Sequence, residues 1–189
     1  MQAESEAWGY SICATPLEPG LPLILGINWG GKADEPEQKE MPARQKFQQQ
    51  IAGGDYSFLR RSSALMAEYA GINVESGHFN YSNLCFFRTP KIDLLTREDY
   101  RHSWPILKRL IERLAPPYII CLGTSAIDHL EESTRERRIP HQQARRQYRA
   151  YAGTIISHPF YALPHPNARV PIGVREDLWK GAGIQFSDS

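Results

Sequence analysis

The chain has 189 residues, of which 41% are hydrophobic and 23% charged, and its formal net charge is +1. This length suits one domain, residues 1–189, with a proper core, and the composition is ordinary for a soluble globular protein. A net charge so close to zero excludes a global electrostatic attraction to nucleic acid or membrane, so any such binding must come from a local patch.

The sequence shows neither a membrane span nor an export signal. Its apolar runs are only as long as a strand, and its first residues lack a basic start and an apolar stretch. Cys13, Cys85 and Cys121 are odd in number, widely spaced and without a Cys-x-x-Cys pair. We therefore expect free thiols in a reducing compartment, the cytoplasm, and no metal or other cofactor.

Hydrophobic spacing and turn residues predict alternating strands and helices. In chain order these are an irregular segment at 1–20, a buried strand at 21–27, a surface loop at 32–55 with a short helix around 43–51, a helix at 57–70, a strand at 79–87, a helix from 96 to 116, a strand at 117–122, a short helix ending near 129, strands at 151–157 and 160–163, and a helix at 174–180. This alternation predicts an α/β fold, a three-layer sandwich with a mainly parallel central sheet and helices on both faces.

Two stretches depart from simple patterns. Pro105 lies inside the helix expected at 96–116 and should kink or restart it. Residues 135–149 hold six arginines among Gln and His. Such a stretch is usually the solvated face of a helix or loop, but it also suits contact with phosphates, and the sequence leaves both interpretations open.

Polar side chains stand at three predicted strands. Asn28 follows the first strand, Asn83 lies within the second, and His165 follows the last. Ligands of α/β proteins bind at the carboxyl ends of parallel strands, which favours a shared site. Structural alternatives exist for each, since Asn28 suits a turn cap and His165 a satisfied turn histidine. A buried amide such as Asn83 must find partners or cost roughly 1–3 kcal/mol.

Four segments resemble motifs of the uracil-DNA glycosylase superfamily, in the same order along the chain. They are GINWGG, SNLCFFRTP, YIICLGTSA and LPHPNAR. The first is similar to the motif of the mismatch-specific and single-strand-selective branches, the second is closest to the thermostable branch, and the last resembles a His-Pro-Ser-type turn. The resemblance spans residues 21–180 and implies an enzyme that extrudes a deaminated base from DNA and removes it, with uracil as the expected base.

The resemblance assigns catalysis to Asn28 and His165. An amide is no strong base, but Asn28 would orient a water beneath the sugar carbon. His165 would donate a hydrogen bond to the base as it becomes anionic, an effect of roughly 3–4 kcal/mol for one good donor. Asn83 would read the base, since an amide offers a donor and an acceptor side by side, as uracil requires.

Other residues are expected to hold the base and the DNA. Ile27 lies beside the turn at Asn28 and is assigned to the base pocket. An aromatic shelf for the base is expected from Tyr56 or Phe58, with Phe47 as second choice, although Phe58 equally suits a core position. The proline-stiffened turn after the last strand should contact DNA through Asn167, Arg169 and Val170.

The sequence also departs from these motifs. Trp29 stands where the first motif has proline, and Asn167 where the last has serine. The three cysteines cannot complete the four-thiolate iron–sulfur site of the thermostable branch. The expected protein is a monomeric hydrolase without cofactor. Alternatives are a hypoxanthine- or thymine-directed relative and a non-catalytic protein that holds a nucleobase or a DNA end.

Overall fold

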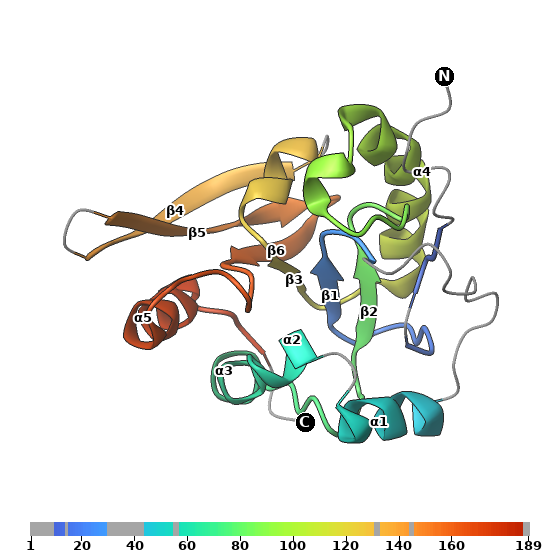
Figure 1. Cartoon of the computed structure of the whole chain (residues 1–189), viewed down its shortest axis with the longest axis horizontal. Helices are drawn as coiled ribbons and strands as arrows, with labels where there is room; N and C mark the ends of the chain where they lie inside the picture. The colour runs from blue at the N-terminus through green and yellow to red at the C-terminus, as the bar shows by residue number, and fades with distance from the viewer. Residues whose placement is uncertain are drawn as a thin grey trace.

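A six-stranded sheet organises the chain (Figure 1). The computed structural model describes residues 10–13, 15–29, 44–54, 57–130, 133–143 and 146–186. The strands are β1 (Leu23–Gly26), β2 (Asn80–Asn83), β3 (Ile119–Leu122), β4 (Ser133–Gln143), β5 (Arg146–Ile155) and β6 (His158–Leu163). The helices are α1 (Arg44–Gly53), α2 (Ser57–Arg60), α3 (Ser63–Ala70), α4 (Arg97–Leu114) and α5 (Ile172–Ala182), with short 3₁₀ turns η2 (Ile92–Leu94) and η3 (Ser125–His129).

The strand order is β2-β1-β3-β6-β5-β4. The four strands β2, β1, β3 and β6 run parallel, whereas β5 and β4 are antiparallel to their neighbours. The prediction of a mainly parallel sheet is thus confirmed. All four parallel strands end at one edge, and there the turns after β1 and β6 meet.

Both faces of the sheet are covered, which makes a three-layer sandwich. Side chains alternate along a strand, so Ile24 enters one core cluster while Leu23 and Leu25 enter the other. Helices α1, α3 and α5 bury their apolar residues in the cluster of Ile24, and α4 and η3 pack on the opposite face. Because the central strands are buried on both sides, they appear in the sequence as short continuous apolar runs.

Helix α4 passes through Pro105 without interruption, so the predicted restart of the helix is wrong. The helix starts with a capping box in which the side chains of Thr96 and Asp99 bond to each other's backbone N–H. Its buried face includes Trp104 and Leu107. Pro105 itself is exposed, and packing on both sides of the proline holds the helix together.

Several predicted boundaries need correction. Of the surface loop expected at 32–55, residues 32–43 lie outside the described residues. The short helix expected around 43–51 is confirmed as α1, whose Phe47 and Ile51 are buried. The predicted helix at 57–70 is two helices, separated by a turn at 61–62. The strand expected at 79–87 ends at Asn83. The chain at 10–13 is less irregular than expected, because isolated bridges join Tyr10 to Phe87 and Cys13 to Ser82.

In its described residues, 135–143 and 146–149, the arginine-rich stretch forms neither a helix nor a loop. Most of it lies in β4 and β5, which pair as a long antiparallel hairpin at one side of the sheet. Within the described residues, no helix combines the length and apolar character needed to cross a membrane.

The three cysteines are free. Cys121 lies in β3, and Cys85 is buried just beyond the end of β2. Burial raises the pKa of Cys85 to about 11 and that of Cys121 to about 12. Both thiols are therefore protonated at neutral pH and are packed as small apolar side chains rather than as nucleophiles.

Candidate functional site

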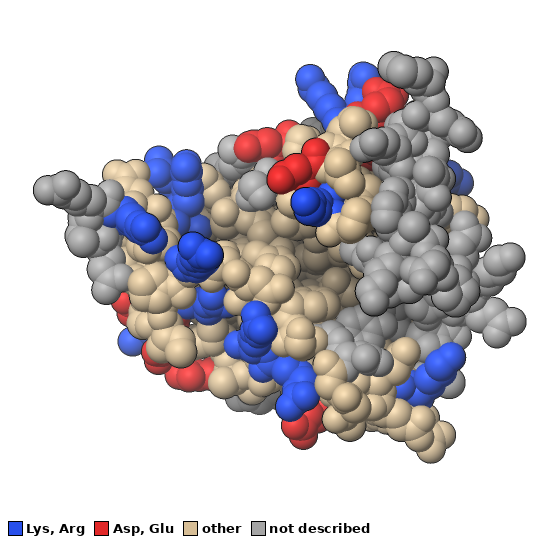
Figure 2. Space-filling model, in the orientation of Figure 1, with Lys and Arg blue, Asp and Glu red and all other residues tan. Residues whose placement is uncertain are grey.

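A cleft of about 690 Å³ opens where β1 and β6 end. Figure 2 shows this side of the molecule hollowed near its centre. The turn after β1 contributes Ile27, Asn28 and Trp29, and the turn after β6 contributes His165 and Asn167. The carboxyl edge of the parallel sheet thus brings together side chains from opposite ends of the chain, as the strand pattern predicted.

The amide of Asn28 is held in one orientation by Thr89. Its Nδ2 donates to Thr89 Oγ1 at 2.7 Å and to the Thr89 carbonyl oxygen at 3.1 Å. Thr89 Oγ1 in turn donates to the Lys91 carbonyl oxygen at 3.0 Å. With both amide hydrogens used in this way, Asn28 Oδ1 is the atom left to accept a hydrogen bond from a molecule in the cleft.

The imidazole of His165 is set as a donor. The Asn167 backbone N–H donates to His165 Nδ1 at 3.1 Å, so the proton of the neutral ring is on Nε2. Burial lowers the pKa of His165 from its usual 6.5, and the positive charge of Arg175 lowers it further. The side chain at neutral pH is therefore an uncharged Nε2–H donor.

Two arginines that sequence reasoning missed hold this turn. Arg175 of α5 is buried and donates to the carbonyl oxygens of Pro166 at 2.9 Å and Ala168 at 3.0 Å. Arg61 donates to Asn167 Oδ1 at 2.7 Å. The turn is thereby fixed from both sides, although its residues 167–169 are exposed. Neither arginine stands in a recognisable motif, so no local pattern pointed to them.

Asn83 lies beneath the cleft rather than in its wall. Its side chain is fully buried, and Tyr81 Oη donates to Asn83 Oδ1 at 3.3 Å. The Nδ2 group has no partner among the described residues. Gly26 and Tyr81, which line the cleft, lie against the side chain of Asn83. A buried donor without a partner costs roughly 1–3 kcal/mol, which favours a functional role for this amide.

Aromatic rings form one wall of the cleft. Phe58 of α2 is half-buried and stacks on the ring of His165, with centroids 6.3 Å apart and planes at 21°. Trp29 meets Tyr81 edge to face at 5.4 Å, and both line the cleft. Phe47 is fully buried, so the second choice for an aromatic shelf is wrong. Tyr56 lies outside the described residues.

Of the three residues expected to contact DNA, only one lines the cleft. Asn167 lines it, and Val170 lines a smaller neighbouring hollow together with Ile27 and His165. Arg169 is exposed on the turn between them and lines neither space. The three residues thus lie on one short surface segment next to the site.

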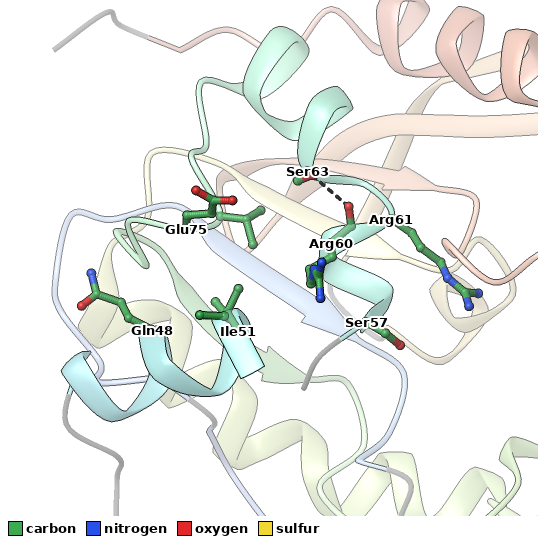
Figure 3. Close-up of a pocket in the computed structure, with 9 residues that line it drawn as sticks. Gln48, Ile51, Ser57, Arg60, Arg61, Ser63 and Glu75 are labelled. Atoms are coloured by element: carbon green, nitrogen blue, oxygen red, sulfur yellow. Dashed lines mark hydrogen bonds between the residues drawn. The ribbon is translucent and has the colours of Figure 1, made fainter. Parts of the chain in front are cut away.

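A second cleft of about 750 Å³ adjoins the first at Ser57 (Figure 3). It lies between α1, α2 and the loop after α3, with Ile51 at its base and Arg60 and Glu75 at its sides. Arg61 lines this cleft and also bonds to Asn167 of the first. The described residues contain no group of three or more His, Cys, Asp or Glu placed to hold a metal ion.

The lowered pKa of His165 predicts a pH effect on stability. The unfolded chain takes up a proton near pH 6.5, whereas the folded chain takes it up only at lower pH. The free energy of unfolding should therefore lose this contribution as the pH falls below about 6.5 and keep it fully above. Urea unfolding at pH 5.5 and 7.5 measures the change, which should be smaller in His165→Gln. Equal changes in the two proteins would contradict the assignment.

Comparison with known proteins does not assign the chain to a family. No protein-family model matches the chain, and a comparison with curated proteins finds no match either.

Proposed function

We propose that this protein is a monofunctional DNA glycosylase that extrudes a deaminated base, uracil in the first place, and removes it by hydrolysis. The observation that carries the proposal is the meeting of Asn28 and His165 in one cleft, each held with a defined hydrogen-bonding atom available. The motif resemblance to the uracil-DNA glycosylase superfamily supports the same assignment. Phe58 beside His165 supplies a ring on which an extruded base can stack.

The proposed reaction breaks the bond between the sugar carbon C1′ and the base nitrogen. The bonding electron pair leaves with the base, so positive charge grows on the sugar and negative charge on the base. Asn28 Oδ1 accepts a hydrogen bond from a water and holds it near C1′, where the water oxygen forms the new bond. The water then gives up a proton to solvent. Excision consumes only water and needs no cofactor.

A neutral His165 suits the departing base. An Nε2–H donor stabilises the anionic oxygen of the base by a positioned hydrogen bond, without transferring a proton to it. The bond from the Asn167 N–H to Nδ1 fixes the ring before the base arrives, so that little reorganisation is required. The same chain provides every one of these groups, so a monomer suffices, and its free thiols suit a reducing compartment such as the cytoplasm.

The proposal is tested by incubating the protein with oligonucleotides that carry uracil, hypoxanthine or thymine mispaired with guanine. Alkali then cleaves the strand wherever a base was removed. Cleavage at uracil supports the proposed substrate, and cleavage only at one of the other bases would assign a related glycosylase. A protein that binds the oligonucleotides and leaves all of them uncut would overturn catalysis and favour a nucleobase-holding protein.

Replacing Asn83 with aspartate should reduce the preference for uracil over cytosine. The carboxylate has the same shape but lacks the Nδ2 donor, so it cannot meet a carbonyl of uracil. We expect the ratio of uracil to cytosine excision to fall by one to two orders of magnitude, about 1–3 kcal/mol. Single-turnover rates on the two substrates measure this ratio. If the variant folds and keeps the full preference, Asn83 is structural.

A further inference from the structure

The β4–β5 hairpin extends beyond the edge at which the site opens (Figure 1). Strand β5 pairs with β6 from Ile155↔His158 to Tyr151↔Ala162. In the same antiparallel register, Ala150 lies level with Leu163, and the residues of β5 before Ala150 lie level with the turn that follows β6. At about 3.3 Å per residue, residues 146–149 carry the strand roughly 13 Å past Leu163, the last residue of β6. The hairpin therefore stands beside the turn of His165.

The two faces of the hairpin differ in character. One face packs on α5 and includes Ile139 and Tyr148, which contact the core, and His141, whose Nδ1 lies 3.5 Å from Asp177 Oδ2. The other face carries Arg149, which is exposed and donates to Tyr151 Oη at 3.4 Å. The charge of Asp177 thus lies on the α5 side, near His141, whereas Arg149 is on the other face. Arg146, two residues before Tyr148, is on the α5 face at the end of the hairpin.

Part of the hairpin lines a hollow that continues from the candidate site. This hollow, of about 250 Å³, is bounded by Gln147, Tyr148 and Arg149 of β5 and by the turn after β6. Ile27 and His165 line both this hollow and the main cleft. A polymer with its reacting unit beside His165 would therefore pass along β5.

Basic side chains gather on this hairpin although the whole chain is nearly neutral. Arg138, Arg146 and Arg149 are exposed, and Figure 2 shows blue side chains over the hairpin and towards the hollow. Edge strands often carry charges that only prevent pairing with another chain. That explanation accounts for Arg138 on the edge strand β4. It does not account for the place of Arg149, whose side chain lines the hollow beside the site.

We propose that the β4–β5 hairpin is a nucleic-acid-binding arm, in which Arg146 and Arg149 contact phosphates of the DNA strand that enters the site. The inference rests on the proposed function for the identity of the polymer. The chemistry is that of guanidinium groups, which bind phosphate oxygens in pairs of hydrogen bonds and release counterions from the strand. Because backbone contacts carry no sequence information, the arm should act on any base sequence.

The test compares three double variants with the wild-type protein. In the first, Arg146→Gln and Arg149→Gln remove both charges of the arm. In the second, Arg146→Lys and Arg149→Lys keep them. The control, Arg109→Gln and Arg113→Gln, removes two exposed charges from α4, which line a different hollow that includes no residue of the hairpin. Fluorescence anisotropy measures binding to a labelled twelve-nucleotide thymidine single strand between 50 and 200 mM salt.

For the glutamine pair in the arm, the slope of log affinity against log salt should become shallower by about 1.4, since each phosphate contact on a single strand contributes about 0.7. Its affinity at 50 mM salt should fall about tenfold or more. The lysine pair and the α4 pair should keep the wild-type slope. An unchanged slope in the glutamine pair, or an equal loss in the lysine or α4 pair, would overturn the proposal.

This experiment is independent of excision. The probe carries no deaminated base, so a protein that removes no base can still bind it through the arm. Conversely, a protein that excises uracil and shows the same salt slope with and without Arg146 and Arg149 retains its proposed function and loses the arm.

Discussion

Replacing Asn28 with alanine should slow base excision by about two orders of magnitude, the scale of losing one positioned group in the transition state. Among residues 27–29, the part of the turn after β1 that the structure describes, the Asn28 amide is anchored by two hydrogen bonds and still presents an oxygen to the cleft. Affinity for DNA should change little, because Asn28 acts on the water and not on the backbone. Single-turnover rates with enzyme in excess, together with anisotropy on the same uracil oligonucleotide, separate the two quantities.

Thr89→Val serves as a matched variant for this prediction. Valine has nearly the same shape as threonine but offers no Oγ1, so Asn28 keeps only the carbonyl oxygen of residue 89 as a partner. The amide is then held less firmly, and we expect a loss of about tenfold, smaller than in Asn28→Ala. An Asn28→Ala protein that folds, binds and excises at the wild-type rate would remove Asn28 from the mechanism.

The sequence predicted where the site lies better than it predicted which residues form it. Asn28 and His165 were identified because each follows an apolar strand, and parallel strands present their carboxyl ends to one edge. Phe58 was left open between core and pocket, and it fulfils both roles, since it packs against the core and lines the cleft. By contrast, Arg175 reaches the turn after β6 from a helix, a contact that depends on tertiary packing and leaves no local pattern.

The hairpin was missed for a different physical reason. A strand is recognised by alternating apolar and polar residues because one of its faces is normally buried. In β4 and the first half of β5 the apolar residues are few, such as Ile139 and Tyr148, and arginine and glutamine fill the positions between them. Pairing between the two strands, rather than burial, holds this part of the sheet. Similarly, Leu84, Cys85 and Phe86 are buried in a loop, so their apolar character suggested too long a strand for β2.

Gly26→Ala should both destabilise the protein and abolish the reading of the base. Gly26 is the last residue of β1 and lies opposite Asn83 in the register of the sheet. A Cβ atom at this position would overlap Asn83 Oδ1 and lie 2.6 Å from Tyr81 Oη. Asn83 is fully buried and Tyr81 is 4% exposed, so neither side chain can turn out into solvent. The backbone or the amide must move.

We expect a loss of about 1–3 kcal/mol in the free energy of unfolding, the usual cost of adding a methyl group to a filled core. Excision of uracil should fall at least as far as in the Asn83 variant, because the amide beneath the cleft is displaced. Urea unfolding measures the first effect and single-turnover excision the second. Gly173→Ala in α5 is the control, since a Cβ there meets nothing within 4 Å, and it should leave both quantities near the wild-type values.

Combining Gly26→Ala with Asn83→Ala tests whether the overlap with Asn83 causes the loss of stability in Gly26→Ala. Removing the amide takes away the atoms nearest the new methyl group, so the double variant should regain part of the stability lost in Gly26→Ala. Excision should stay low, because the base-reading amide is displaced in Gly26→Ala and absent in the double variant. If Gly26→Ala instead unfolds at the wild-type urea concentration, the floor of the cleft is more open than the packing of Gly26, Tyr81 and Asn83 implies, and the place of Asn83 beneath the base is wrong.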